Sequence, residues 1–231
     1  MDGIFVTATD TAVGKTILSA ALLSAMARSE CPVRAYKPAL TGLDEEAGTW
    51  PADHELLAAA AQMSPDEVAP LRFGPAVAPH LAARLQGTPL PAHTIHEGAR
   101  AALERANALG AKLIVEGVGG LLCPLADDLS VADVMAELAL PALLAARPGL
   151  GTINHTLLTL DAARGRGIEV LAVVLTPWPE SPTALEESNR DTIARQGEVS
   201  VHTLASVAGP DLGALADAGA RLPWRRWLEL R

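Results

Sequence analysis

The segment that most constrains the fold of this chain lies at its N-terminus. An apolar run at Ile4–Thr7 leads directly into the turn Ala8–Gly14. A helix-forming stretch then opens at Lys15 and Thr16. Free N–H groups in the first turn of a helix bind anions, and the helix dipole favours negative charge there. A lysine at this place can hold the β and γ phosphates of a nucleotide, and a threonine hydroxyl can bind Mg²⁺. We therefore predict a strand, a phosphate-binding loop and a helix in succession.

The loop departs from the strict pattern G-x-x-x-x-G-K-[ST], because Thr9 stands where the first glycine would be. A dinucleotide-binding turn would need G-x-G-x-x-G, and the segment contains only Gly14. An ordinary strand-to-helix turn is the structural alternative. The place of Gly-Lys-Thr between an apolar run and an uninterrupted helix favours phosphate binding.

Short apolar runs alternate with helical patterns along the chain. Continuous apolar runs are typical of parallel strands that are covered on both faces. The predicted strands are Ile4–Thr7, Val33–Tyr36, Lys112–Val115, Ala142–Ala146, Val170–Leu175 and Val199–His202. The predicted helices are Thr16–Ser29, Asp53–Gln62, Thr94–Leu109, Ser130–Leu138, Thr152–Arg164 and Thr183–Gln196. This alternation predicts a three-layer α/β fold with a doubly wound, mostly parallel sheet, and residues 1–231 as a single domain of the phosphate-loop NTPase type.

Local signals refine this outline. Pairs that fit or resemble the capping-box spacing at helix starts are Thr94 with Glu97, Thr183 with Glu186, and Ser130 with Asp133. The longest segments without a clear pattern, Pro38–Ala52 and Leu71–Pro79, follow predicted strands and are expected at the ligand-binding edge of the sheet. Pro177–Pro182 is expected to be a short rigid connector.

The composition limits the possible partners. Of the 231 residues 49% are hydrophobic and 19% are charged, and the net charge is −9. This acidic balance argues against nucleic acid or an anionic membrane as a partner. Apolar runs are all interrupted before they reach membrane-spanning length. Cys31 and Cys123 have no metal-ligand or disulfide spacing, so we expect reduced thiols and a cytoplasmic location.

The C-terminal segment is an exception to the acidic balance. Basic and aromatic residues gather there: Arg221, Trp224, Arg225, Arg226, Trp227 and Arg231. A packed amphipathic tail is the favoured interpretation, and a basic patch for nucleic acid or an anionic membrane is the alternative.

A second lysine, Lys37, ends the predicted strand Val33–Tyr36 and is followed by proline. Held at that edge, it would point toward a triphosphate and stabilise charge that develops at a phosphoryl or carboxylate centre. A solvated surface lysine is the alternative.

Two carboxylates are candidates for Mg²⁺, which prefers oxygen ligands. Glu116 closes the apolar run Lys112–Val115, and the glycines that follow it allow the backbone to approach a ligand. Asp53 opens a predicted helix, so it is either a metal ligand or an N-cap.

Together these motifs resemble the dethiobiotin synthetase family. The matching segments keep the family's order and spacing over about residues 4–165, and they are Thr9–Thr16, Lys37-Pro38 with Thr41-Gly42, Val115–Gly120, Pro124-Leu125, Ala132-Asp133 and Leu150–His155. The resemblance implies a Mg²⁺-dependent, ATP-driven carboxylation of 7,8-diaminononanoate with CO₂. The substrate is converted through a carbamate and a carbamic-phosphoric anhydride into dethiobiotin.

The resemblance also implies roles for individual residues. The catalytic residues would be Lys37 and Lys15, and the metal ligands Thr16, Asp53 and Glu116. The nucleotide would contact Ala12, Val13, Gly14, Lys15, Thr16, Ile17, Gly117, Val118 and Gly119. The substrate would contact Thr41 and, across a homodimer interface, the helix start formed by Gly151, Thr152, Ile153 and Asn154.

Departures from the family pattern affect the base site. Ala8 replaces a glycine, and Thr176-Pro177 replaces an Asn-Asp pair that reads adenine in many members. The usual Gly-x-Ile-Pro segment is replaced by a stretch that includes Ala205, Ser206 and Val207. Because Pro177 lacks an N–H and Thr176 lacks an amide's paired donor and acceptor, we expect relaxed base selectivity, with CTP accepted as well as ATP.

A nucleotide-switch ATPase of the partition or septum-positioning type is the alternative function, since it shares this fold class. Such proteins usually carry a further lysine early in the phosphate loop, where this chain has Ala8, Thr9 and Asp10. Their DNA- or membrane-binding surfaces also fit the acidic balance poorly.

Overall fold

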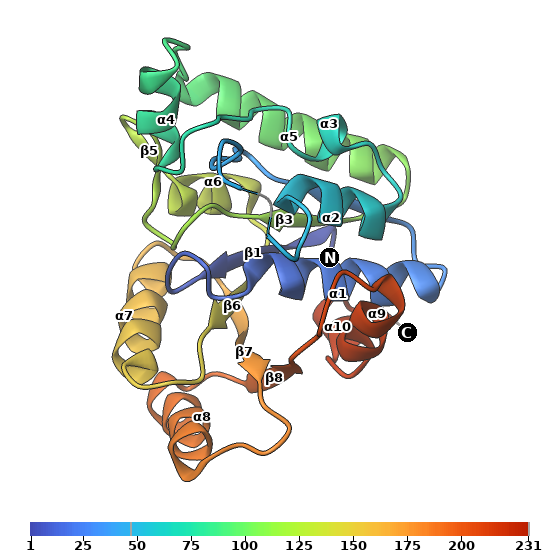
Figure 1. The fold of residues 1–231 in the computed structure, drawn as a ribbon, viewed down its shortest axis with the longest axis vertical. Coiled ribbons are helices and arrows are strands. Elements are labelled where there is room, and N and C mark those ends of the chain that lie inside the picture. The colour runs from blue at the N-terminus through green and yellow to red at the C-terminus, as the bar shows by residue number, and fades with distance from the viewer. Residues whose placement is uncertain (47, 231) are drawn as a thin grey trace.

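The computed structural model describes residues 1–46 and 48–230, and a parallel sheet forms its centre (Figure 1). Its six strands lie in the order β2-β3-β1-β6-β7-β8, and every neighbouring pair is parallel. Their bounds are β1 Gly3–Ala8, β2 Val33–Tyr36, β3 Lys112–Glu116, β6 Ala142–Ala146, β7 Val170–Trp178 and β8 Val201–Ala205. A small antiparallel pair consists of β4 Pro124–Ala126 and β5 Leu129–Ser130.

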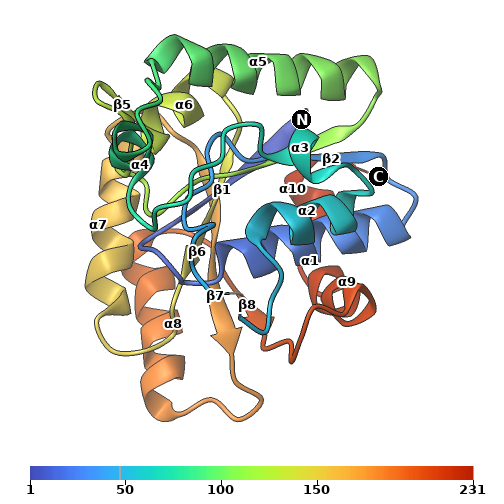
Figure 2. The same ribbon diagram turned by 45° about the horizontal axis from the view of Figure 1, so that its top comes forward.

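Helices cover both faces of this sheet (Figure 2). One face packs against α1 Lys15–Arg28, α2 Asp53–Ala61, α3 Pro65–Val68, α9 Leu212–Ala220 and α10 Trp224–Trp227. The other face packs against α4 Pro79–Leu85, α5 Ala92–Ala108, α6 Val131–Leu138, α7 Thr152–Arg164 and α8 Ala184–Gly197. The predicted doubly wound, three-layer α/β fold is confirmed.

The central strand explains why the apolar runs do not alternate with polar residues. All six residues of β1 are buried. Ile4 and Val6 pack into the cluster beneath α1, whereas Phe5 packs into the cluster on the opposite face. Successive side chains of a strand point to opposite faces, so a strand with helices on both sides needs apolar residues at every position.

The predicted strands agree with the structure at β2 and β6, whose bounds match. At the edge, β8 begins at Val201, two residues later than predicted, and extends to Ala205. Neighbouring β7 continues to Trp178, so it takes in the first residues of Pro177–Pro182, which we expected to be a connector. Both differences lie where the strands carry polar residues or proline, and there the apolar pattern does not mark their ends.

The expected capping box is confirmed at Thr183, whose side chain accepts from Glu186 N. At Ser130 only half of the box forms, because Ser130 N donates to Asp133 but the Ser130 side chain accepts no backbone hydrogen bond. The third prediction is wrong, because α5 begins at Ala92 after Pro91 and Thr94 therefore lies within its first turn. Helices α3, α4, α9 and α10 were not predicted. The α9 sequence is dominated by alanine and glycine, so it lacks the apolar periodicity that marks a surface helix.

The C-terminal segment packs as an amphipathic tail. Trp224 and Trp227 are buried in the cluster that also holds α1, and the Arg225 guanidinium lies 4.5 Å from the centre of the Trp224 ring. Arg231 lies outside the described residues. Within the described part, Cys31 and Cys123 are both free thiols, and no helix there is long and apolar enough to span a membrane.

Helices α1 and α9 approach so closely that one residue between them has no room for a side chain. A Cβ on Gly219 would lie 2.0 Å from the Ala21 carbonyl oxygen, whereas a Cβ on Gly209 would meet nothing within 4 Å. We expect Gly219→Ala to lower the free energy of unfolding by about 2 kcal/mol or more, because the backbone must shift. Urea denaturation, with Gly209→Ala as the matched control, measures this; equal stability of the two variants contradicts the packing.

Candidate active site

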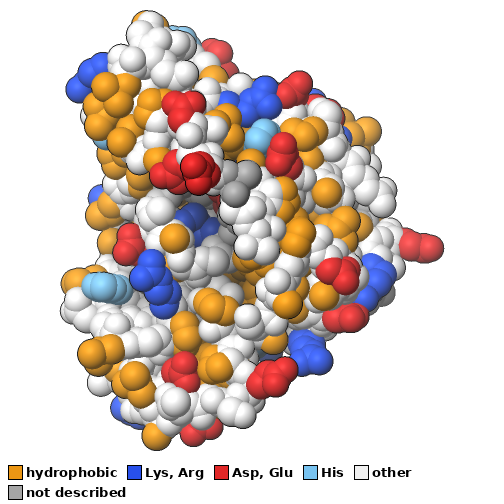
Figure 3. Space-filling view, in the orientation of Figure 1, with side chains coloured by type: hydrophobic (Ala, Val, Ile, Leu, Met, Phe, Trp, Pro, Cys, Tyr) orange, Lys and Arg blue, Asp and Glu red, His pale blue; other side chains and the backbone are white. Residues whose placement is uncertain are grey.

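The carboxyl ends of the central strands place the phosphate loop and several of the predicted site residues around one cavity. Residues 9–14 connect β1 to α1, and Gly14 precedes α1 in the left-handed region at φ 96°. A Cβ there would also lie 2.9 Å from the Thr176 methyl carbon, so both the conformation and the close approach require glycine. Figure 3 shows a hollow on this face, with Lys and Arg side chains within it and acidic side chains along its upper rim.

Lys15 begins α1 and folds back over the loop. Its ammonium donates a hydrogen bond of 3.2 Å to the Asp10 carbonyl, and its side chain is largely buried. Burial lowers the pKa of Lys15, and the nearby Lys37 lowers it further, against an opposing effect of Glu116. A buried ammonium group whose hydrogen bond goes to a neutral carbonyl favours an anionic ligand.

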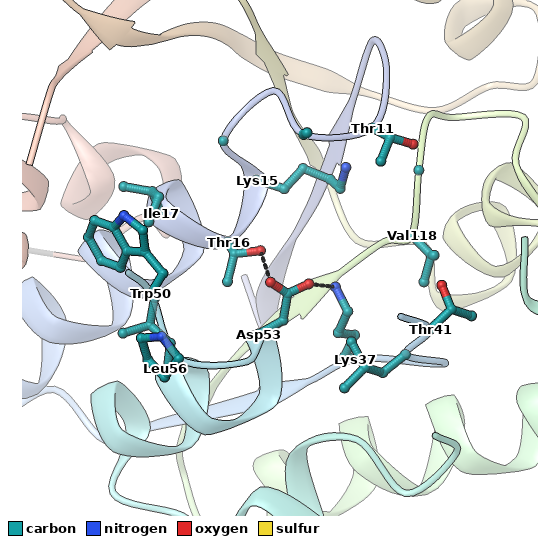
Figure 4. Close-up of a pocket in the computed structure, with 15 residues that line it drawn as sticks. Thr11, Lys15, Thr16, Ile17, Lys37, Thr41, Trp50, Asp53, Leu56 and Val118 are labelled. Atoms are coloured by element: carbon teal, nitrogen blue, oxygen red, sulfur yellow. Dashed lines mark hydrogen bonds and ion pairs between the residues drawn. The ribbon is translucent and has the colours of Figure 1, made fainter. Parts of the chain in front are cut away.

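Lys37 lies at the centre of the site (Figure 4). It follows β2, it is only 2% exposed, and its Nζ lies 2.6 Å from Glu116 Oε1 and 2.9 Å from Asp53 Oδ2. Burial alone would lower the pKa of Lys37, but the two carboxylates raise it above its usual range. Lys37 is therefore a buried cation, and the surface-lysine alternative is wrong.

The Thr16 hydroxyl joins the same cluster. Its Oγ1 lies 2.9 Å from Asp53 Oδ1 and 3.0 Å from Glu116 Oε1. Asp53 is the first residue of α2, and the N-cap position belongs to Ala52. Burial opposes ionisation of Asp53, but Lys37 outweighs it and lowers the pKa of the carboxyl. Asp53 is thus not the N-cap, which was its structural alternative.

A cavity of about 370 Å³ opens beside this cluster. Its walls include Lys15, Thr16, Lys37, Asp53, Thr41, Val118 and Gly119 together with Ala12, Gly14 and Ile17. A second cavity, of about 440 Å³, shares Thr41 and Asp53 with the first and extends toward residues 76–78. The two cavities thus meet at Thr41 and the metal-candidate carboxylate.

The two segments without a clear pattern form much of this region, as expected. Leu40 N donates to the Leu71 carbonyl at 2.9 Å, and Phe73 N donates to the Leu40 carbonyl at 2.8 Å. This pairing fixes Pro38–Ala52 beside Leu71–Pro79, although Ala47 lies outside the described residues.

Other predicted residues lie elsewhere. Val13 packs into the core beneath α1, and Gly117 packs against Val131 and Phe5, so neither residue lines the cavity. Thr176 is buried against the phosphate loop. The residues Ala205, Ser206 and Val207 line a separate groove of about 920 Å³ with Trp178, which follows Pro177 in β7.

The segment Gly151–Asn154 opens α7 and does not line the Lys15–Lys37 cavity of its own chain. Gly151 adopts φ 89°, Thr152 is buried, and Asn154 is exposed. Leu150 before it is 91% exposed, an unusually open position for a large apolar side chain.

Sequence reasoning missed two contributors to the site. Arg147 follows β6 and donates a hydrogen bond of 3.0 Å to the Thr11 carbonyl in the phosphate loop. The sequence signal for Arg147 was its position directly after the predicted strand Ala142–Ala146. In the structure this strand, β6, pairs in parallel with β1, so the two strands end at the same edge of the sheet. Trp50 lies in the Pro38–Ala52 segment and forms a cavity wall beside Ile17 and Leu56 (Figure 4).

Comparison with known proteins agrees with this geometry. A family model described as an AAA domain matches residues 2–208. The ATP-dependent dethiobiotin synthetases BioD of Brucella ovis and of Brucella melitensis biotype 2 are each 40% identical over 201 residues, which make up 85% of this chain and 82% of theirs. The solved structure of Cyanthece apo McdA has a TM-score of 0.55 at 11% identity and covers 94% of this chain and 90% of that chain, a likeness of fold alone. The motif resemblance is confirmed, and the chain belongs to the ATP-dependent dethiobiotin synthetase family.

Proposed function

We propose that this chain catalyses the ATP-driven, Mg²⁺-dependent conversion of 7,8-diaminononanoate and CO₂ into dethiobiotin. Family membership supports the overall reaction. The observation that carries the proposal for this chain is the single cavity lined by Lys15, Lys37, Thr16 and Asp53, with Glu116 at its base. In this cavity two lysine side chains and two carboxylates lie together at the start of α1, directly after the phosphate loop.

The reaction proceeds in three steps. One amine of the substrate attacks CO₂ and loses a proton, which gives a carbamate. A carbamate oxygen attacks the γ-phosphorus, the bond to the leaving nucleoside diphosphate breaks, and a carbamic-phosphoric anhydride forms. The second amine then attacks the carbonyl carbon and loses a proton to solvent, and the bond from that carbon to the phosphate oxygen breaks, so phosphate leaves as the ureido ring closes.

The two lysines have separate tasks in this scheme. Lys15, at the start of α1, holds the phosphates together with the loop N–H groups. Lys37 stabilises the negative charge of the carbamate and of the transferred phosphoryl group, where a fixed ammonium in a buried site is most effective. Thr41 lines both cavities, which supports a role for it as a substrate contact.

The oxygen atoms at the base of the cavity fit Mg²⁺. The Thr16 hydroxyl oxygen lies 2.9 Å from Asp53 Oδ1 and 3.0 Å from Glu116 Oε1, and Glu116 Oε2 is buried with no hydrogen-bond partner among the described residues. Among the described residues no group of three or more His, Cys, Asp or Glu could hold a metal by itself. Triphosphate oxygens would complete such a site, so Thr16, Asp53 and Glu116 would hold the ion together with the nucleotide, and the ion would supply charge neutralisation there.

The substrate carboxylate is proposed to bind the α7 start, Gly151–Asn154, of a second copy in a homodimer. Free N–H groups at a helix start suit a carboxylate. Apolar surface next to this segment supports the pairing, because Leu150 is 91% and Leu158 is 59% exposed.

The direct test is mass-spectrometric detection of dethiobiotin from diaminononanoate, bicarbonate, Mg²⁺ and ATP. We expect product only with the complete mixture, and Lys37→Ala should lower kcat by at least about a hundredfold while the fold persists. Lys112→Ala is the matched control, because Lys112 lies at the opposite end of β3 and donates to the Met1 carbonyl. Phosphate release that ignores both diaminononanoate and bicarbonate would instead indicate a nucleotide-switch ATPase.

The base site predicts relaxed nucleotide selectivity. Thr176 is buried against Gly14, and Pro177 has no N–H, so neither side chain offers an amide to adenine. We expect kcat/KM for CTP to lie within about tenfold of the value for ATP, a difference below about 1.4 kcal/mol. Initial rates with the four nucleoside triphosphates decide this, and a strong preference for ATP alone contradicts it.

Arg147 is proposed to hold the phosphate loop in its binding shape. The loop needs support because Ala12, a non-glycine residue, adopts φ 53°. Removing the hydrogen bond to Thr11 in Arg147→Ala should raise the KM for ATP about fivefold, equivalent to about 1 kcal/mol. Steady-state kinetics measure this, and exposed Arg195 on α8 provides the matched control as Arg195→Ala. Equal KM values for both variants would exclude the role.

A further inference from the structure

The Lys37 ammonium lies between the two carboxylates to which the proposed function assigns Mg²⁺. Its Nζ is 2.6 Å from Glu116 Oε1 and 2.9 Å from Asp53 Oδ2. Both the ammonium and the Glu116 carboxylate are buried. In this arrangement one lysine ammonium is shared between the two carboxylates.

The same oxygens cannot serve both cations equally well. Glu116 Oε1 accepts from Lys37 and also from the Thr16 hydroxyl at 3.0 Å. Mg²⁺ held by Asp53 and Glu116 would use these same lone pairs, and it would take the Thr16 oxygen as a ligand rather than leave the hydroxyl as a donor to the carboxylates. The hydrogen bonds from Lys37 and Thr16 to the carboxylates must therefore break when the metal binds, and metal–oxygen contacts would replace them.

Charge favours that exchange. Two carboxylates carry two negative charges, and the Lys37 ammonium neutralises only one of them. Lys15 is directed elsewhere, since its Nζ donates to the Asp10 carbonyl. A divalent ion neutralises both carboxylates, and an ammonium left beside it would be repelled. The flexible four-carbon stem of lysine allows the charge to move without movement of the backbone.

We propose that Lys37 occupies the metal site as an internal counterion until Mg²⁺ and the nucleoside triphosphate bind together and displace its ammonium into the cavity. This inference rests on the proposed function, which assigns the carboxylates to Mg²⁺. Lys37 already lines the cavity, so the displaced ammonium faces the phosphates and the carbamate. The charge that stabilises the carbamate is therefore released only after the metal nucleotide has bound.

Manganese binding in the absence of nucleotide tests the exchange without turnover. Mn²⁺ titration followed by electron paramagnetic resonance compares the wild-type protein with Lys37→Met, Lys15→Met and Lys112→Met. Lys37→Met should bind Mn²⁺ at least about tenfold more tightly than wild type, because the competing ammonium is gone. Lys15→Met should show a smaller gain, and Lys112→Met none. Unchanged or weaker Mn²⁺ binding by a folded Lys37→Met protein overturns the proposal.

A second measurement uses the wild-type chain, in case Lys37→Met fails to fold. Lysine occurs only at positions 15, 37 and 112, so ¹⁵N-lysine labelling gives three side-chain signals. Adding Mg²⁺ with β,γ-imido-ATP should shift the Lys37 ammonium signal and speed its hydrogen exchange, and should leave Lys112 unchanged. The same nucleotide in EDTA should leave the Lys37 signal in place. A Lys37 signal that Mg²⁺ and nucleotide together do not change also overturns the exchange.

Both readouts are independent of product formation. A protein that makes no dethiobiotin disproves the proposed function whatever the manganese result. If the protein makes dethiobiotin but the metal nucleotide does not change its Lys37 signal, the proposed function stands and the proposed displacement of Lys37 is disproved.

Discussion

The buried carboxylate of Glu116 is the group on which the site depends. An ionised carboxylate inside a protein is very costly unless it is paired and hydrogen-bonded. Glu116 is fully buried, and the two groups that contact its Oε1 come from α1 and from the end of β2. Its carboxylate therefore binds both Thr16 and Lys37, and Lys37 in turn forms an ion pair with Asp53 at the start of α2.

Strand order makes this convergence possible. Lys37 is 79 residues from Glu116, and Thr16 is 100 residues from it. In the sheet, β3 lies directly between β2 and β1, and the parallel register aligns Tyr36 with Val115 and Val6 with Glu116. The residues that leave these strands consequently meet at one edge. The buried apolar faces of the helices exclude water from the sheet, and each electrostatic contact is stronger where water is excluded.

Much of this arrangement could be predicted from local patterns. The apolar runs located all six strands of the main sheet, and lysine or carboxylate residues at their ends indicated where the chemistry would lie. Patterns failed where structure depends on packing. Helix α9 is recognised by its contact with α1 through Gly219 and not by periodicity, and β8 is an edge strand of mixed polarity. Thr94 has the spacing of a cap, but α5 already begins at Ala92, directly after Pro91.

The sequence by itself determined the fold class, the family and the candidate residues, because apolar runs and the Gly-Lys-Thr loop are local features that can be recognised without knowledge of the tertiary structure. Only the tertiary structure decided how those residues are paired. It buries Lys37 between two carboxylates, turns Val13 and Gly117 into packing residues, and brings Arg147 to the phosphate loop. Such pairings depend on which strands lie side by side, and strand neighbours are selected by the packing of the whole chain and not by any one segment.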